Sequence, residues 1–154
     1  MEGESELQEA AAVEPWSDWI ELGAPGSTER AFVRFDSLGG SVAEIRLADF
    51  FIAEGLSDEQ RQERENQVAV VQPAVTHEQT LQTFMVRPQI SARELLVSDL
   101  TTVHWEHRLL DDGVEFTHRD AGGLTLVKTI RHSSEAFQLE VALAVESPTA
   151  AVAV

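Results

Sequence analysis

The sequence is organised around residues 113–146, which read GVEFTHRDAGGLTLVKTIRHSSEAFQLEVALAVE. Apolar and polar side chains alternate in three runs within this stretch, beginning at Val114, Leu124 and Phe137. A period of two puts alternate side chains on one face of a β-strand, so each run predicts a strand with one buried face. Because the polar breaks between the runs are short, we predict an antiparallel meander.

The last run, residues 137–146, is the most regular of the three. A large apolar residue stands at every odd position, and a polar residue or alanine stands at every even one. We expect this strand to lie inside a larger sandwich, with Phe137, Leu139 and Val141 in the core.

Turn residues divide the rest of the chain into further short elements. Gly39 and Gly40 predict a tight hairpin with positive φ angles. Asp111 and Asp112, followed by Gly113, predict a hairpin that leads into the meander. The predicted strands are residues 19–22, 31–36, 42–47, 68–75, 80–86 and 101–108.

One short helix is expected among these strands. Ser57 and Gln60 have the spacing of a capping box, which predicts a helix that starts there and continues to about Asn66. This helix has almost no apolar stripe, so we place it on the surface. Pro73 makes residues 68–75 an edge strand or an irregular connection. Residues 23–27 predict a turn, and residues 91–100 fit either a short helix or a strand.

The composition limits the classes of partner. The formal net charge is −16, from 27 acidic and 11 basic residues. Such a surface repels phosphate backbones and anionic lipid headgroups, so we predict no nucleic-acid partner. The chain has no cysteine, which excludes a disulfide framework and a cysteine nucleophile.

The length of 154 residues fits one domain with a sizeable core. We divide the chain into an acidic tail or linker at residues 1–15, a β-sandwich domain at 16–147 and a frayed end at 148–154. The first residues lack the features of a signal peptide, and no apolar run approaches the roughly 20 residues that span a bilayer. The sequence therefore predicts a soluble piece.

Four histidines fall in the predicted sheet, and neutral imidazoles bind zinc readily. On one strand His104 and His107 point to opposite faces, so a shared site would need His104 with Glu106, or His107 with His118 across the hairpin. His132 stands at the end of a predicted strand. We predict ordinary strand histidines, with no metal and no cofactor.

No other residue pattern points to catalysis. The chain has no Gly-x-Ser-x-Gly motif, and the Gly39-Gly40 pair lacks the residues of a phosphate-binding loop. The carboxylates of Asp111 and Asp112 are explained by their turn. We therefore predict a protein that is not an enzyme and has no catalytic residue.

Lys128 is an unusual residue in its run, because it shares a strand face with Leu124, Leu126 and Ile130. A long lysine stem can cover apolar surface while its ammonium reaches water or a carboxylate. We expect a lysine of this kind at a strand edge, and the alternative is a lysine that contacts a ligand in a cleft.

Several segments together resemble the large periplasmic domain of the bacterial membrane protein insertase family YidC. Residues 33–50 contain a Gly-Gly turn and a strand that ends in Leu-Ala-Asp-Phe, and residues 123–131 read GLTLVKTIR. The segments that carry the resemblance are residues 19–23, 33–50, 103–105, 113–116, 123–131 and 137–141.

The resemblance implies an all-β fold, an antiparallel β-supersandwich like that of galactose-mutarotase-like proteins, in a partial or minimal version. It further implies a domain that assists insertion and folding of inner-membrane proteins without catalysing a reaction. Its partners would be Sec translocon components and nascent membrane proteins, at the periplasmic face of the inner membrane. The family's transmembrane region and the second half of its sandwich are not in this sequence, so we expect a fragment of a larger membrane-anchored protein.

Two alternatives remain open from the sequence. A carbohydrate-binding or mutarotase-like protein would use an acid and a base facing one pocket, and His104 with Glu106 is the one local pair of that kind. A β module that binds peptides at an exposed sheet edge is compatible with the insertase interpretation.

Overall fold

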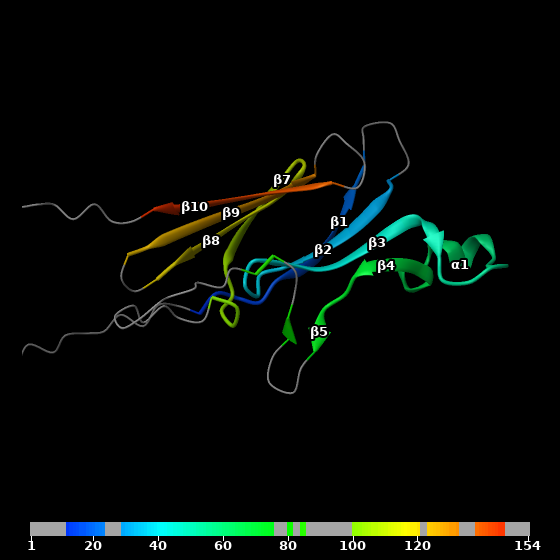
Figure 1. Cartoon of the computed structure of the whole chain (residues 1–154), viewed down its shortest axis with the longest axis horizontal. Helices are drawn as coiled ribbons and strands as arrows, with labels where there is room; N and C mark the ends of the chain where they lie inside the picture. Colours follow the sequence, from blue (N-terminus) through cyan, green and yellow to red (C-terminus); the bar gives the residue numbers. More distant parts are fainter. Residues whose placement is uncertain are drawn as a thin grey trace, which may run out of the picture.

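The structure is a computed structural model that describes residues 12–23, 29–75, 80–81, 84–85, 100–120, 123–132 and 138–146. These residues form two antiparallel four-stranded sheets, one pair of very short strands, and one α-helix followed by a 3-10 turn (Figure 1). The two large sheets contribute to one hydrophobic core. The predicted all-β sandwich with one short helix is therefore confirmed.

The first sheet follows the chain order. Its strands are β1 (Ser17–Leu22), β2 (Ala31–Asp36), β3 (Ser41–Phe51) and β4 (Gln67–Val71). The short pair consists of β5 (Ala74–Val75) and β6 (Thr80–Leu81). Of the strand predicted at residues 80–86, the structure has β6 and a turn at Phe84. Residues 91–99 and positions 24–27 of the predicted turn lie outside the described residues.

The second sheet is the predicted meander. Its strands, in spatial order, are β10 (Leu139–Glu146), β9 (Thr125–His132), β8 (Gly113–Arg119) and β7 (Glu106–Leu110). Leu110 pairs with Gly113, so Asp111 and Asp112 form the two-residue hairpin loop that the sequence predicts. β7 starts later than predicted because residues 100–103 form a turn and His104 makes only an isolated bridge to Leu38.

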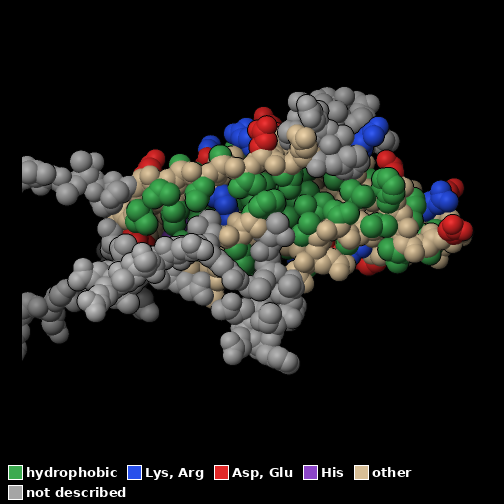
Figure 2. All heavy atoms as spheres, viewed as in Figure 1, with side chains coloured by type: hydrophobic (Ala, Val, Ile, Leu, Met, Phe, Trp, Pro, Cys, Tyr) green, Lys and Arg blue, Asp and Glu red, His purple; other side chains and the backbone are tan. Residues whose placement is uncertain are grey.

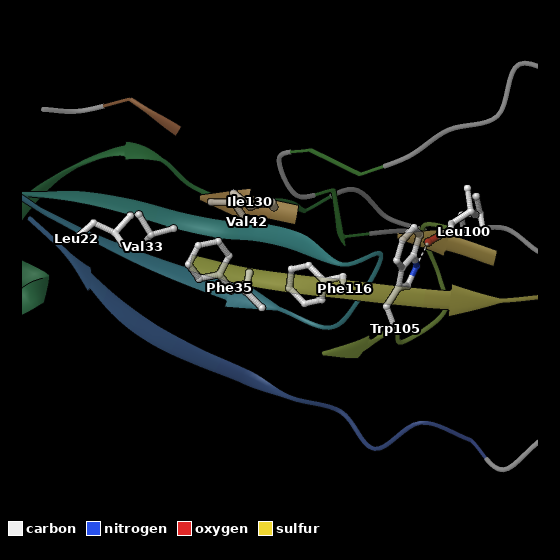
Figure 3. Close-up of a cluster of buried hydrophobic side chains, with 10 residues drawn as sticks. Leu22, Val33, Phe35, Val42, Leu100, Trp105, Phe116 and Ile130 are labelled. Atoms are coloured by element: carbon white, nitrogen blue, oxygen red, sulfur yellow. Dashed lines mark hydrogen bonds between the residues drawn. The ribbon is translucent and has the colours of Figure 1, made fainter. Parts of the chain in front are cut away.

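The core lies between the two sheets and has the faces that alternation predicts. Alternate side chains of β2 are buried, as are Val114 and Phe116 of β8 and alternate side chains at the centre of β9. Figure 3 shows Phe35 of β2 and Phe116 of β8 among the buried side chains, with Trp105 beyond them. The indole N–H of Trp105 donates to the carbonyl oxygen of Leu100 at 3.2 Å, so the polar atom of this buried ring is satisfied.

The prediction that the last strand lies in the interior is wrong. β10 is an edge strand, and 41% of Val141, 47% of Leu143 and 57% of Val145 is exposed. Only Leu139 is partly buried against the core, and Phe137 lies outside the described residues. Alternation reports which side chains share a face, but it does not report whether a second sheet covers that face.

The short helix lies on the surface, as predicted. α1 (Asp58–Gln62) carries the expected capping box, and η1 (Arg64–Asn66) follows it. Its attachment does not need an apolar stripe, because the Arg64 guanidinium lies 5.0 Å from the ring centre of Trp19 and 4.9 Å from that of Phe32. Arginine stacked on aromatic faces thus holds this segment on the outer face of the first sheet.

The burial pattern predicts a sharp contrast between two apolar positions. We expect Phe35→Ala to lower the free energy of unfolding by about 3–5 kcal/mol, because it empties a fully buried site. Leu143→Ala should cost less than about 1 kcal/mol, because its side chain is half exposed. Urea unfolding monitored by tryptophan fluorescence measures both values, and equal losses would contradict the sandwich packing.

Candidate functional site

Lys128 is the only buried residue among the charged residues that the structure describes, with 1% of its surface exposed. It stands on β9 between Leu126 and Ile130, and its side chain enters the core. The sequence-based expectation of a lysine that reaches water is therefore wrong, and the residue is enclosed rather than placed in an open cleft.

The Lys128 ammonium contacts three groups inside the sandwich. Nζ donates to the carbonyl oxygen of Gly39 at 2.9 Å and to that of Phe84 at 2.7 Å. It also lies 4.9 Å from the ring centre of Trp105, which adds a cation–π contact. No ion pair joins it to a carboxylate of the described residues. Two carbonyl dipoles and an aromatic face therefore replace the hydration of this group.

Burial lowers the pKa of Lys128 to about 7, from an ordinary value of 10.5. Moving a charged ammonium out of water is costly, so burial favours the neutral amine. Lys128 is the single lysine of the chain, which also has no tyrosine and no cysteine. No second lysine, tyrosine or cysteine therefore adds to the titration of the chain between neutral pH and pH 10.

The N–H groups of the Gly39-Gly40 turn bond to the loop before β7 and within the turn itself. The φ angles of Gly39 and Gly40 are 62° and 51°, which confirms the predicted positive values. Gly39 N–H donates to the carbonyl oxygen of Val103 at 2.9 Å, and Gly40 N–H donates to that of Ser37 at 2.9 Å. Since both N–H groups are used inside the fold, this turn is not a phosphate-binding loop.

Gly40 also allows a close approach between the sheets. A β-carbon at this position would lie 2.9 Å from the side chain of Phe116 and 3.2 Å from Trp105. We call Gly39, Gly40, Trp105, Phe116 and Lys128 the lysine hub. These five residues come from four separate parts of the sequence and meet at one end of the core.

Two of the histidines are occupied by packing or hydrogen bonds. His104 Nδ1 lies 2.7 Å from Ser37 Oγ, so the side chain joins the loop before β7 to the turn after β2. The His107 ring stacks on Trp16, with 4.0 Å between ring centres.

His118 lies beside Trp105, with 5.5 Å between ring centres, and its Nε2 is buried without a partner among the described residues. Burial lowers its pKa, and nearby Asp120 partly opposes that shift. Because His107 and His118 pack on different tryptophans, they do not form the common site considered from the sequence. Across the described residues, no group of three or more histidine or carboxylate side chains is placed to hold a metal ion.

The pair His104 and Glu106 does share one cleft. This cleft has a volume of about 590 Å³, within the usual range of small-molecule sites. Thr117, His118 and Arg119 complete one wall, and the N-terminal segment contributes Ala12 and Val13. The cleft therefore brings two imidazoles, a carboxylate and a guanidinium to one place.

The remaining sequence candidates have structural roles. The carboxylate of Asp112 accepts two hydrogen bonds from Arg131 Nη1, at 3.0 and 3.1 Å. His132 N–H donates to the carbonyl oxygen of the same residue at 2.8 Å. The Asp111-Asp112 turn is thus attached to β9, and its carboxylates need no catalytic explanation.

Comparison of the chain with protein-family models, curated proteins and solved structures found no match. The described part of the chain contains no helix that is long and apolar enough to cross a membrane.

Sequence reasoning singled out Lys128 and the glycine pair but did not connect them. The single lysine of the chain, at an inward position of an apolar strand, was a sign of a special environment. The stacked Arg64 was missed altogether, because cation–π contacts between distant segments leave no local pattern.

The buried lysine predicts a specific pH dependence. Between pH 7 and 10.5 the unfolded chain holds the lysine proton and the folded chain releases it, so stability rises with pH in this window. The gain in folding stability from the neutral Lys128 amine is complete above pH 10.5, the pKa of the unfolded lysine. This gain is lost as pH falls through about 7, the pKa in the folded chain. We expect the urea midpoint of the wild type to rise from pH 7 to pH 10, and that of Lys128→Met to lose this rise.

Arg108→Lys is the control, because it adds a lysine at an exposed position. This variant should keep the wild-type slope, since an exposed lysine titrates alike in both states. A flat wild-type profile, or an equal slope in Lys128→Met, would contradict the enclosed position of the amine.

The glycine turn predicts a second contrast. Gly55 has a φ of 75° and open space around it, so Gly55→Ala should cost only the left-handed strain of about 1–2 kcal/mol. Gly40→Ala adds a clash with Phe116 and should cost about 1–3 kcal/mol more. Urea unfolding of both variants checks the difference, and equal losses would rule out the close approach of the sheets.

Proposed function

We propose that this chain is the β-sandwich interaction domain of a YidC-like membrane protein insertase. In this role it assists insertion and folding of inner-membrane proteins at the periplasmic face, as part of a larger membrane-anchored protein. Its partners are Sec translocon components and nascent membrane proteins, and the domain itself catalyses no reaction.

The observation that carries this proposal is where the resembling segments meet. The Gly-Gly turn of residues 33–50, the Val103–Trp105 segment, Phe116 and Lys128 lie far apart in the sequence but converge on the lysine hub. If the short motifs resembled the family only by chance, their residues would not be expected to contact one another. Their convergence supports a common design of the sandwich.

The chemistry of the lysine hub supports a role without catalysis. The amine of Lys128 is enclosed and donates to two backbone carbonyls, and the N–H groups of the glycine turn are bonded within the fold. These polar groups support the architecture and contact no open surface. Function is therefore expected from the exposed surface of the sandwich.

Photo-crosslinking tests this proposal directly. Amine-reactive reagents are unsuitable, because the single lysine is buried, so a photoreactive amino acid is placed at Leu143, Leu109 or Glu59, all of them exposed. Each chain is illuminated with membranes that contain the Sec translocon and a stalled nascent inner-membrane protein. We expect adducts with a translocon subunit or with the nascent chain from at least one position.

Two controls make the result decisive. Phe35→Ala combined with each photoreactive position should lose the adducts in proportion to unfolding, and a stalled cytosolic nascent chain should give none. Absence of adducts from all three positions in the folded protein would overturn the insertase role.

A second function is favoured by the cleft that holds His104 and Glu106. A sugar-binding or mutarotase-like protein needs an acid and a base on one pocket, and these two residues line the same one. Polarimetry with an aldose would detect mutarotation. Activity that is lost in His104→Ala and kept in His107→Ala, whose ring stacks on Trp16 instead, would favour this function over the first.

A further inference from the structure

We propose that the outer edge of β10 binds an extended polypeptide segment in which three alternating apolar residues stand between two basic residues. The bound segment would add a fifth strand to the second sheet. This inference rests on the proposed role as an interaction domain, and it adds the place of binding and the chemistry of the partner.

β10 is longer than the other edge strands of the two large sheets, β1, β4 and β7, and its only charged side chains are Glu140 and Glu146. Natural edge strands are kept short, charged, bulged or interrupted by proline. β7 has five residues, including Glu106 and Arg108, and β4 has five residues with register shifts and is followed by Pro73. β10 has eight residues, with no proline and no basic residue.

The inner face of β10 is apolar and uncovered by the described residues. Val141, Leu143 and Val145 pair with Ile130, Lys128 and Leu126 of β9, so they share the face that is buried elsewhere in the sheet. Figure 2 shows hydrophobic side chains in a band along this side of the molecule, between the two sheets.

A small cavity continues this band between the sheets. It has a volume of about 100 Å³ and is lined by Leu47, Val70 and Leu139, among others. An added strand would place its inward side chains beside this apolar surface.

The outer face of β10 determines the charge of the partner. Glu140 and Glu146 stand on this face, six residues apart, with only Ala142 and Ala144 between them. Arg131 lies opposite Glu140 on β9, but its guanidinium binds Asp112 at 3.0 Å. The edge therefore presents two carboxylates that a basic strand could pair with.

A second copy of this chain fits the edge poorly. Two antiparallel registers pair seven residues of each copy and keep the apolar faces together. The register centred on Leu143 places Glu140 opposite Glu146 twice, and the register centred on Ala142 places Glu140 opposite Ala144. Like charges directly opposite each other destabilise a strand pair. The net charge of −16 on each copy adds to this repulsion. A cationic segment avoids both costs.

The register gives the partner a defined pattern. Basic residues at positions one and seven face the two glutamates, and apolar residues at two, four and six face Val145, Leu143 and Val141. The peptide Arg-Val-Thr-Val-Thr-Val-Arg has this pattern. Glu-Val-Thr-Val-Thr-Val-Glu keeps the same β propensity and reverses the charge.

Fluorescence anisotropy with these two labelled peptides tests the proposal. We expect the arginine peptide to bind the full chain at least about tenfold more tightly than the glutamate peptide, in low salt. Leu143→Lys places a charge on the inward face of the edge and should weaken binding about tenfold or more. Leu109→Lys is the matched control, because Leu109 is similarly exposed on the opposite edge strand of the same sheet.

Hydrogen exchange provides the second measurement. Bound arginine peptide should slow exchange of β10 amides and leave those of β7 unchanged. Equal affinity for both peptides, or equal losses in Leu143→Lys and Leu109→Lys, would overturn strand addition at β10. If the wild-type chain forms a dimer and Leu143→Lys dissociates it, the β10 edge binds a second copy of the chain, and the proposed basic peptide partner is overturned. If Leu143→Lys unfolds, Val145→Lys provides the same test at a more exposed position.

The two proposals can fail separately. Peptide binding without translocon or nascent-chain adducts would remove the insertase role and keep the edge site. Adducts without selective peptide binding would keep the interaction domain and overturn strand addition at β10.

Discussion

The structure depends on the bonds that the Lys128 amine makes inside the sandwich. An amine without partners would be costly in this position, because burial removes its hydration. The carbonyl oxygens of Gly39 and Phe84 and the face of Trp105 replace that hydration. Phe84 itself has a φ of 64°, which is uncommon for a bulky residue. The Lys128 side chain of the second sheet thereby bonds both the β2–β3 turn of the first sheet, at Gly39, and the distant segment that contains Phe84.

The sequence predicted what depends on neighbouring residues and missed what depends on distant ones. A period of two was sufficient for the meander and for the buried faces of Phe116 and Ile130, and turn chemistry was sufficient for Gly39 and Asp112. The partners of Lys128 lie 89 and 44 residues away in the sequence, so no local pattern contains them. The alternation in β10 is as regular as in β9, yet its apolar face is exposed, because alternation does not encode whether another element covers that face.

Architecture and recognition therefore reside in different parts of this domain. All five residues of the lysine hub lie in segments that resemble a known family, and their polar groups are used within the fold. A resemblance of this kind supports a shared sandwich more strongly than a shared partner. The surface proposed for binding is the apolar face of β10 and its two glutamates, and only the start of this strand, within residues 137–141, takes part in the resemblance.

At the edge strand β10, acidic side chains affect strand pairing as well as solubility. An unprotected apolar strand would ordinarily pair with its own copies. Glu140 and Glu146 oppose the register centred on Leu143, in which they lie face to face, while the same two carboxylates favour a basic strand. Specificity is a difference between affinities, so one pair of side chains can reject the wrong partner and select the right one.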